Sequence, residues 1–234
     1  MTQFVLVSGA WLDERAWSDV VPHLRAAGHG AHPLTLSGLG ARQGVPAGQR
    51  THVEDITGAI EARDLREVVL VGHSYSGIPV GQAAARIGDR LARVVYVDAN
   101  IPIDGSAFAN PSGRGAEIFA AIEAHDGVWP PPAPAEFGGQ GLTEAQLARL
   151  LAEAAPHPGA PLTEPAVLDR SLSELPTTYV KCLLDWPEPF PEVVELLTGP
   201  RWELVEMDTG HWPMYSRPRE LADVLLAAAA RKRP

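Results

Sequence analysis

The stretch VLVGHSYSGIPV, residues 69 to 80, constrains the fold more than any other part of the chain. An apolar run ends at Gly72, and a helix-like stretch begins only a few residues later. A strand that turns this sharply into a helix needs small residues where the two backbones approach each other. The segment therefore predicts a strand, a tight corner at Ser74 and a helix packed against the strand.

Other short apolar runs predict further strands of the same sheet. These runs are continuous rather than alternating, which favours strands that are covered on both faces, as in a parallel sheet. The predicted strands are residues 4–7, 31–36, 68–72, 93–98, 177–183 and 202–207.

Helical patterns lie between these strands. Apolar residues follow the i, i+3, i+4, i+7 spacing of a one-sided helix in residues 15–27 and again in residues 221–228. Thr51 and Glu54 have the spacing of a capping box and predict the start of another helix. Alternation of strand and helix up to about residue 100 indicates right-handed βαβ crossovers.

The alternation stops in the middle of the chain. Residues 104–175 show no convincing strand, and they contain a proline-rich run and a helix that opens at Thr143 with Gln146 three residues on. We expect this segment to be a helical cap over the carboxyl ends of the strands, and residues 1–103 and 176–234 to form the core. The predicted fold class is α/β, with a doubly wound, mainly parallel sheet and a helical cap insertion.

Composition narrows the classes of function. The formal net charge of -10 and the absence of a long basic run argue against nucleic-acid and membrane-surface partners. The only cysteine, Cys182, lies in an apolar segment and is expected to be a buried thiol. No secretory signal or membrane-spanning stretch is evident, so a cytoplasmic location is expected. Residue spacing predicts no metal site and no nicotinamide cofactor.

The corner at Ser74 matches a motif that carries chemistry. In G-x-S-x-G, a strained turn between strand and helix projects a serine hydroxyl from the top of the sheet. Gly72 and Ser74 fit this pattern, while Ser76 stands where the last glycine is expected and Gly77 follows one place later. A serine that merely occupies a tight turn is the structural alternative.

A serine nucleophile needs a base and a carboxylate that orients the base. His211 follows the last predicted strand, so its side chain should emerge at the same sheet edge as Ser74. Asp185, just past the strand at 177–183, ranks first as the acid because of chain order. Asp98, which ends the strand at 93–98, is its rival.

Backbone amides should hold the oxyanion of the reaction. The amide of Tyr75, which follows the nucleophile, is one expected donor. The loop after the first strand, SGAW, should supply a second donor from Ala10 or Trp11.

Motifs along both flanks of the chain together resemble a known family. The segments FVLVSGAW, VLVGHSYSG, VVYVDANIPIDG, YVKCLLD and MDTGHWPMYSRPREL look like the α/β-hydrolase superfamily, in particular its compact esterase branch of plant methylesterases and hydroxynitrile lyases. The resemblance implies a Ser74, Asp185, His211 triad. The family usually has His-Gly in the first loop, where this chain has Ser8. The lyases have a lysine where this chain has Trp212, which disfavours lyase activity.

The tryptophans have two interpretations. Trp11, Trp129, Trp186 and Trp212 can be core or cap packing, which is the better interpretation for each alone. Three of them adjoin the catalytic loops, however, which hints at an apolar or aromatic acyl pocket. Trp129 and Trp212 therefore join Ala10, Trp11 and Tyr75 as candidate oxyanion or substrate-binding residues.

The predicted function is a serine hydrolase that cleaves a small, largely uncharged carboxylic ester through an acyl-enzyme, without a cofactor. Two alternatives stay open. One is a lyase, cyclase or acyltransferase that uses the same site, and the other is a ligand-binding protein with a vestigial triad. The sequence does not fix the oligomeric state, and a homodimer is compatible with it.

Overall fold

The computed structural model describes residues 1–112 and 115–231. In chain order its strands and α-helices are β1 (Gln3–Val7), α1 (Val21–Ala26), β2 (Gly30–Leu34), α2 (Gln49–Glu61), β3 (Val68–His73), α3 (Gly77–Ile87), β4 (Leu91–Val97), α4 (Ala116–Ala124), β5 (Val128–Trp129), α5 (Glu144–Glu153), β6 (His157–Pro158), α6 (Ala160–Thr163), β7 (Thr177–Cys182), α7 (Pro191–Leu197), β8 (Trp202–Met207), α8 (Pro213–Ser216) and α9 (Pro218–Ala230).

A six-stranded sheet with the order β2-β1-β3-β4-β7-β8 forms the centre of the molecule. Every neighbouring pair in it is parallel. All six predicted strands are present, with ends that agree or differ by at most two residues. The predicted α/β fold class with a doubly wound parallel sheet is confirmed.

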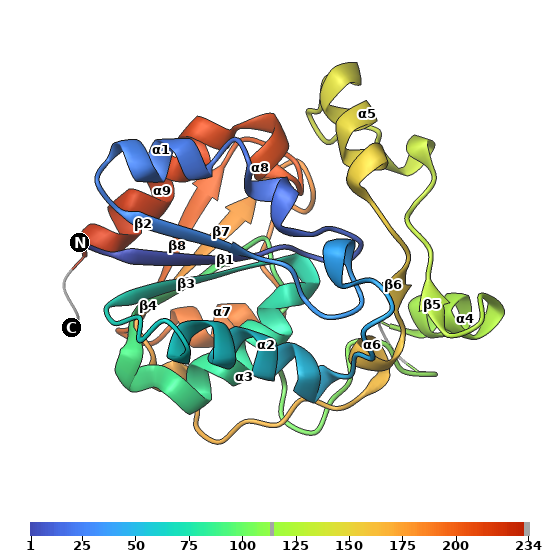
Figure 1. The fold of residues 1–234 in the computed structure, drawn as a ribbon, viewed down its shortest axis with the longest axis horizontal. Coiled ribbons are helices and arrows are strands. Elements are labelled where there is room, and N and C mark those ends of the chain that lie inside the picture. Colours follow the sequence, from blue (N-terminus) through green and yellow to red (C-terminus); the bar gives the residue numbers. More distant parts are fainter. Residues whose placement is uncertain (113–114, 232–234) are drawn as a thin grey trace.

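Helices cover both faces of this sheet (Figure 1). Side chains alternate along β1, so that Phe4 and Leu6 pack with α1 and α9, whereas Val5 and Val7 pack with α2 and α3 on the other face. Burial on both faces explains why the strand sequences are continuously apolar.

Two predicted helix starts are wrong, and one is confirmed. The helix expected from residue 15 begins only at Val21, after a 3₁₀ turn at Glu14–Trp17, because Pro22 suits the first turn of a helix and not its interior. α2 begins at Gln49, before Thr51, which therefore does not cap it. Thr143 caps α5 as predicted, since its hydroxyl accepts from the amide of Gln146.

Most of the segment between β4 and β7 lies beyond the carboxyl ends of the strands, with α4 and α6 on one side and α5 apart from them (Figure 1). We refer to it as the cap. It also contains an antiparallel pair, β5 with β6, that the sequence did not predict because each strand has only two residues. A small apolar cluster joins the cap to the turn after β3, and it includes Tyr75, Ile78, Ile122 and Leu162.

Within the described residues, no helix has both the length and the apolar character that a membrane crossing requires.

Candidate active site

Ser74 lies at a strained corner between β3 and α3. Its φ angle of 54° falls in the left-handed region, which is rare for a residue with a side chain. Small residues surround it. A Cβ on Gly9 would lie 2.7 Å from Cβ of Ser74, and a Cβ on Gly72 would lie 3.0 Å from Val80. Gly72 of the motif and Gly9 in the loop after β1 therefore make room for a turn that exposes the Ser74 hydroxyl.

Ser76, which stands in place of the usual glycine, braces this corner. Its buried hydroxyl accepts a hydrogen bond from the amide of His73 and lies 2.9 Å from the carbonyl oxygen of Val7, at the end of β1. The departure from the motif thus adds a bond between the strand ends and leaves the turn intact.

The structure brings Ser74 and His211 together across 137 residues of sequence. Oγ of Ser74 lies 2.8 Å from Nε2 of His211, within hydrogen-bond distance. His211 reaches this position from the loop between β8 and α8. Proton transfer between the hydroxyl and the imidazole requires this geometry.

Two carboxylates face the other ring nitrogen of His211. Oδ2 of Asp98 lies 2.7 Å from Nδ1, and Oδ2 of Asp185 lies 3.4 Å from it. Chain order ranked Asp185 first, whereas distance ranks Asp98 first. Asp98 is also the more deeply buried, with a side chain 2% exposed against 24% for Asp185. Both candidate acids therefore belong to the site.

The carboxylates control the protonation of His211. Burial alone would lower its pKa, but hydrogen bonds and charge from Asp185 and Asp98 outweigh burial and raise the pKa to about 9. The same contacts shift the pKa of Asp185 in the opposite direction. Burial tends to raise the pKa of Asp185, yet the bond and charge of His211 lower it to about 2.

Lys181 stands behind Asp98 and was missed as a site residue. Its buried ammonium group pairs with Oδ1 of Asp98, and the amide of Cys182 donates to the same oxygen at 3.2 Å. A lysine inside the apolar run TTYVKCL was the available signal, because a buried charge requires a partner. Cys182 itself is fully buried, as predicted.

In the loop after β1, the amides of the two candidate oxyanion donors, Ala10 and Trp11, differ in whether they already have a hydrogen-bond acceptor. The amide of Trp11 already donates to Nδ1 of His157, at 3.3 Å. Among the described residues, the amide of Ala10 has no hydrogen-bond acceptor. Tyr75 lies in the first turn of its helix, where amides lack partners within the helix. Ala10 and Tyr75 are therefore the better-placed pair of donors.

His73 connects this loop to the loop of His211. Its Nδ1 accepts from the amide of Gly9 at 3.3 Å, so Nε2 carries the proton and donates to the carbonyl oxygen of His211 at 2.7 Å. Burial, with a smaller effect from the neighbouring His211 ring, lowers the pKa of His73 to about 3. The ring is thus a neutral brace between the corner at Ser74 and the loop of His211.

Two further buried histidines support the cap side of the site. Nε2 of His52 bonds the carbonyl oxygen of Ser37, and its Nδ1 lies 3.1 Å from the Tyr75 hydroxyl. His157 holds the Trp11 amide through Nδ1, while among the described residues its buried Nε2 has no partner. Burial lowers the pKa of both histidines.

The candidate tryptophans mainly pack against other side chains. The rings of Trp11 and Trp129 lie 4.2 Å apart between centroids, and Trp212 is buried against Phe137 at 4.7 Å. Neither Trp129 nor Trp212 lines the cavity beside the site. Trp186 does line it, although its side chain is 63% exposed.

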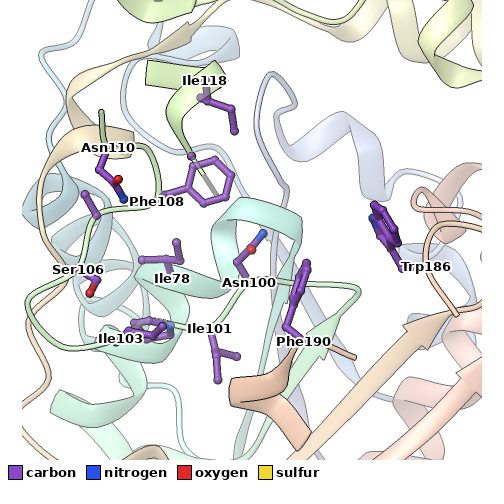
Figure 2. Close-up of a pocket in the computed structure, with 13 residues that line it drawn as sticks. Ile78, Asn100, Ile101, Ile103, Ser106, Phe108, Asn110, Ile118, Trp186 and Phe190 are labelled. Carbon is purple, nitrogen blue, oxygen red and sulfur yellow. The ribbon is translucent and has the colours of Figure 1, made fainter. Parts of the chain in front are cut away.

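A cavity of about 460 Å³ lies beside the corner at Ser74. Figure 2 shows the residues that line it. Ile78, one helical turn beyond Ser74, forms part of its wall, and Phe108 and Ile118 line it from the cap. None of the described residues that line it carries a charge. A smaller cavity adjoins it through Asn100, Trp186 and Phe190, and includes His211, Asp98 and Asp185 in its walls.

Asp98, Asp185 and His211 also bring ligand-type atoms within 4.8 Å of one another. Both carboxylates already face Nδ1 of His211, and the Lys181 ammonium group would repel a cation at Asp98. The donor set therefore fits a hydrogen-bonded triad better than a metal centre.

Comparison with known proteins identifies the family. The model of the alpha/beta hydrolase family matches residues 4–224. The chain is 32% identical to a carbendazim hydrolyzing esterase of Nocardioides sp. (strain SG-4G), over 97% of this chain and 99% of that protein. It is 26% identical to methylesterase 7 of Arabidopsis thaliana, over 97% of this chain and 96% of that protein.

A solved structure shows the same fold. An extracellular alpha/beta-hydrolase from a Paenibacillus species superposes with a TM-score of 0.86 at 22% identity, covering 99% of this chain and all of that one. The sheet order, the strained turn at Ser74 and these relatives all indicate the same family. The chain belongs to the α/β-hydrolase family, within its esterase branch.

Proposed function

We propose that this protein is a serine hydrolase that cleaves small, largely uncharged carboxylic esters through an acyl-enzyme intermediate. The observation that carries the proposal is the line of contacts from Oγ of Ser74 to Nε2 of His211 and from Nδ1 to a buried carboxylate. A hydroxyl activated in this way can attack an ester carbonyl.

In the first half-reaction, Nε2 of His211 takes the proton of Ser74 as Oγ bonds to the carbonyl carbon. The resulting imidazolium is stabilised by Asp98 and Asp185, and the oxyanion by the amides of Ala10 and Tyr75. The carbon–oxygen bond to the alcohol then breaks, and the alcohol leaves with the proton from His211. The acyl group stays on Ser74.

Water completes the cycle by the same route. His211 takes a proton from water as its oxygen bonds to the acyl carbon, and the bond to Oγ of Ser74 then breaks as His211 returns the proton. The products are the free acid, the alcohol and the unmodified serine.

The cavity favours a neutral substrate over an ionic one. Its volume of about 460 Å³ suits a small organic group, and the uncharged side chains that line it would not compensate the desolvation of an ionic one. The 32%-identical relative is a carbendazim hydrolyzing esterase, which supports ester hydrolysis by this chain.

Short 4-nitrophenyl esters test the proposal. We expect a burst of nitrophenol equal to the enzyme concentration whenever deacylation is slower than acylation, and steady turnover afterwards. Ser74→Ala should abolish both, while Ser173→Ala, at an exposed serine outside the site, should change neither. Turnover that survives Ser74→Ala would rule out the acyl-enzyme.

A further inference from the structure

The cap contributes one side chain that touches two catalytic loops. Gln140 lies in the loop before α5, and its Oε1 accepts from the amide of His211 at 2.6 Å. Its Nε2 donates to Oδ1 of Asp185 at 3.2 Å. A single amide therefore connects the backbone of the base to one of its two acids.

Chemistry fixes the orientation of this amide. The His211 peptide N–H can only donate, and the Asp185 carboxylate can only accept. The oxygen of Gln140 must therefore face His211, and its nitrogen must face Asp185. No other uncharged side chain of this length offers an acceptor and a donor together in this way.

Glycines make the close approach of the two loops feasible. A Cβ on Gly210, directly before His211, would overlap the backbone oxygen and Oε1 of Gln140. On the cap side, Gly139 and Gly141 flank Gln140 with φ angles of 78° and 69°, a conformation that suits glycine. Both loops are thus shaped to bring this side chain against His211.

His211 is consequently held from several directions. The core holds its carbonyl oxygen through His73 and its Nδ1 through Asp98. The cap holds its amide through Gln140. Removal of Gln140 would leave the ring in place on the Asp98 side and would free Asp185 to turn toward solvent.

We propose that Gln140 is a positioning residue, through which the cap sets the orientation of Asp185 and His211 for catalysis. The inference rests on the proposed function and assigns to the cap a part in the geometry of the triad, in addition to enclosing substrate.

Three variants test the proposal. Gln140→Leu removes both hydrogen bonds at similar volume and should lower kcat roughly tenfold to a hundredfold, with KM changed less than about twofold. Gln140→Glu keeps an acceptor for the His211 amide and adds charge. Gly210→Ala retains every hydrogen-bonding group, but its Cβ displaces Gln140 sterically. It should therefore reproduce the kcat loss of Gln140→Leu.

The pH profile separates positioning from mere structural support. Among the described residues, the ionisable side chains that contact His211 or line the small cavity with it are Asp98 after β4, Tyr179 and Lys181 in β7, Asp185 and Glu188 in the following loop, and His73 at the end of β3. When Gln140→Leu releases Asp185, His211 loses a stabilising charge, so the acid limb of kcat/KM should move to lower pH. Gln140→Glu also loses the donor to Asp185, but it places its own carboxylate beside His211, so its limb should stay at higher pH than that of Gln140→Leu.

Gln146 provides a matched control. This cap glutamine also bonds twice, accepting from the amide of Thr143 and donating to the carbonyl oxygen of Tyr215 in α8, but it touches neither Asp185 nor His211. Gln146→Leu should lower the melting temperature without moving the acid limb.

The outcomes are distinct. An acid limb that moves to lower pH in Gln140→Leu and lies higher in Gln140→Glu than in Gln140→Leu, with no displacement in Gln146→Leu, supports the proposal. A Gln140→Leu enzyme with the kcat and pH profile of Gln146→Leu overturns it. If Gln140→Leu does not fold, Gln140→Glu and Gly210→Ala decide, since unchanged kcat and pH profile in both also overturn it. Failure of the parent protein to react with 4-nitrophenyl esters refutes the proposed function instead.

Discussion

Oδ2 of Asp98 lies 2.7 Å from Nδ1 of His211, closer than Asp185, which chain order ranked first as the acid. The other oxygen of Asp98 is held by Lys181 and by the amide of Cys182, so the carboxylate cannot readily turn away. Asp185 approaches the same nitrogen from a more exposed position. His211 is thus held between two carboxylates of unequal burial, and the first prediction separates their roles.

Asp98→Asn should reduce kcat more than Asp185→Asn does. Replacement of the acid of a serine triad by its amide can cost on the order of 10⁴-fold in kcat, because the imidazole takes the wrong tautomer. The more distant Asp185 should cost less. Steady-state kinetics of both variants on one nitrophenyl ester checks this order, and a larger loss in Asp185→Asn would make that residue the principal acid.

A control is needed because Asp98→Asn also leaves Lys181 buried without a counterion, which typically costs about 3–5 kcal/mol of stability. Asp98→Asn combined with Lys181→Met should regain melting temperature without regaining kcat. Recovery of both would show that Asp98 acts on stability alone.

The rate should rise with pH well above neutrality. His211 must be neutral to accept the Ser74 proton, and hydrogen bonds and charge from Asp185 and Asp98 outweigh burial and raise its pKa to about 9. The acid limb of kcat/KM should therefore lie near that pH in the parent enzyme. Asp185→Asn removes one negative charge and should shift the limb downward. A limb near the ordinary pKa of histidine, unmoved by Asp185→Asn, would contradict the two-acid site.

Stability should fall steeply under acid conditions that many proteins tolerate. Burial lowers the pKa of His52, His73 and His157 in the folded state, so unfolding takes up protons once the pH drops below about 6.5. Each histidine contributes up to about 1.4 kcal/mol per pH unit in that window. His211 acts in the opposite sense, since its raised pKa stabilises the fold below about 6.5 and this gain is lost as pH rises through about 9.

Thermal melts from pH 4.5 to 9.5 should accordingly show maximum stability near pH 6.5, with the steeper decline on the acid side. His52→Asn removes one titrating group and should reduce the acid slope. A melting temperature that is level from pH 4.5 to 6.5 would show that these rings are not buried neutral.

The cavity should govern the preference among esters. Ile118 lines it from α4, so Ile118→Trp would occupy part of the volume that an acyl or alcohol group takes. We expect higher KM for esters with bulky apolar groups and little change for acetate esters. The exposed Val194 on α7 provides the matched control, and Val194→Trp should leave both unchanged. Equal effects on all esters would place substrate elsewhere.

Local patterns in the sequence predicted the core well. The six strands were visible because each is buried on both faces, and the nucleophile corner was visible because close packing around Ser74 demands small residues. His211 could be selected by its place after the last strand. These features depend on spacing along short stretches of chain.

The remaining site depends on contacts between distant segments. The order of Asp98 and Asp185 follows from their distances to Nδ1 of His211, 2.7 and 3.4 Å, which no local pattern predicts. Gln140 was invisible because its partners lie 45 and 71 residues away along the chain. Lys181 did leave a signal, a charge within an apolar strand, yet its partner could not be named without the strand order.

The most direct test of the central claim is the intact mass of the protein after reaction with a fluorophosphonate. We expect one adduct per chain, on the peptide that contains Ser74, and no adduct in Ser74→Ala or in protein with Ser74 already acylated by an ester. A parent protein that stays unmodified, or one labelled at a different residue, would contradict the claim that Ser74 is an activated nucleophile.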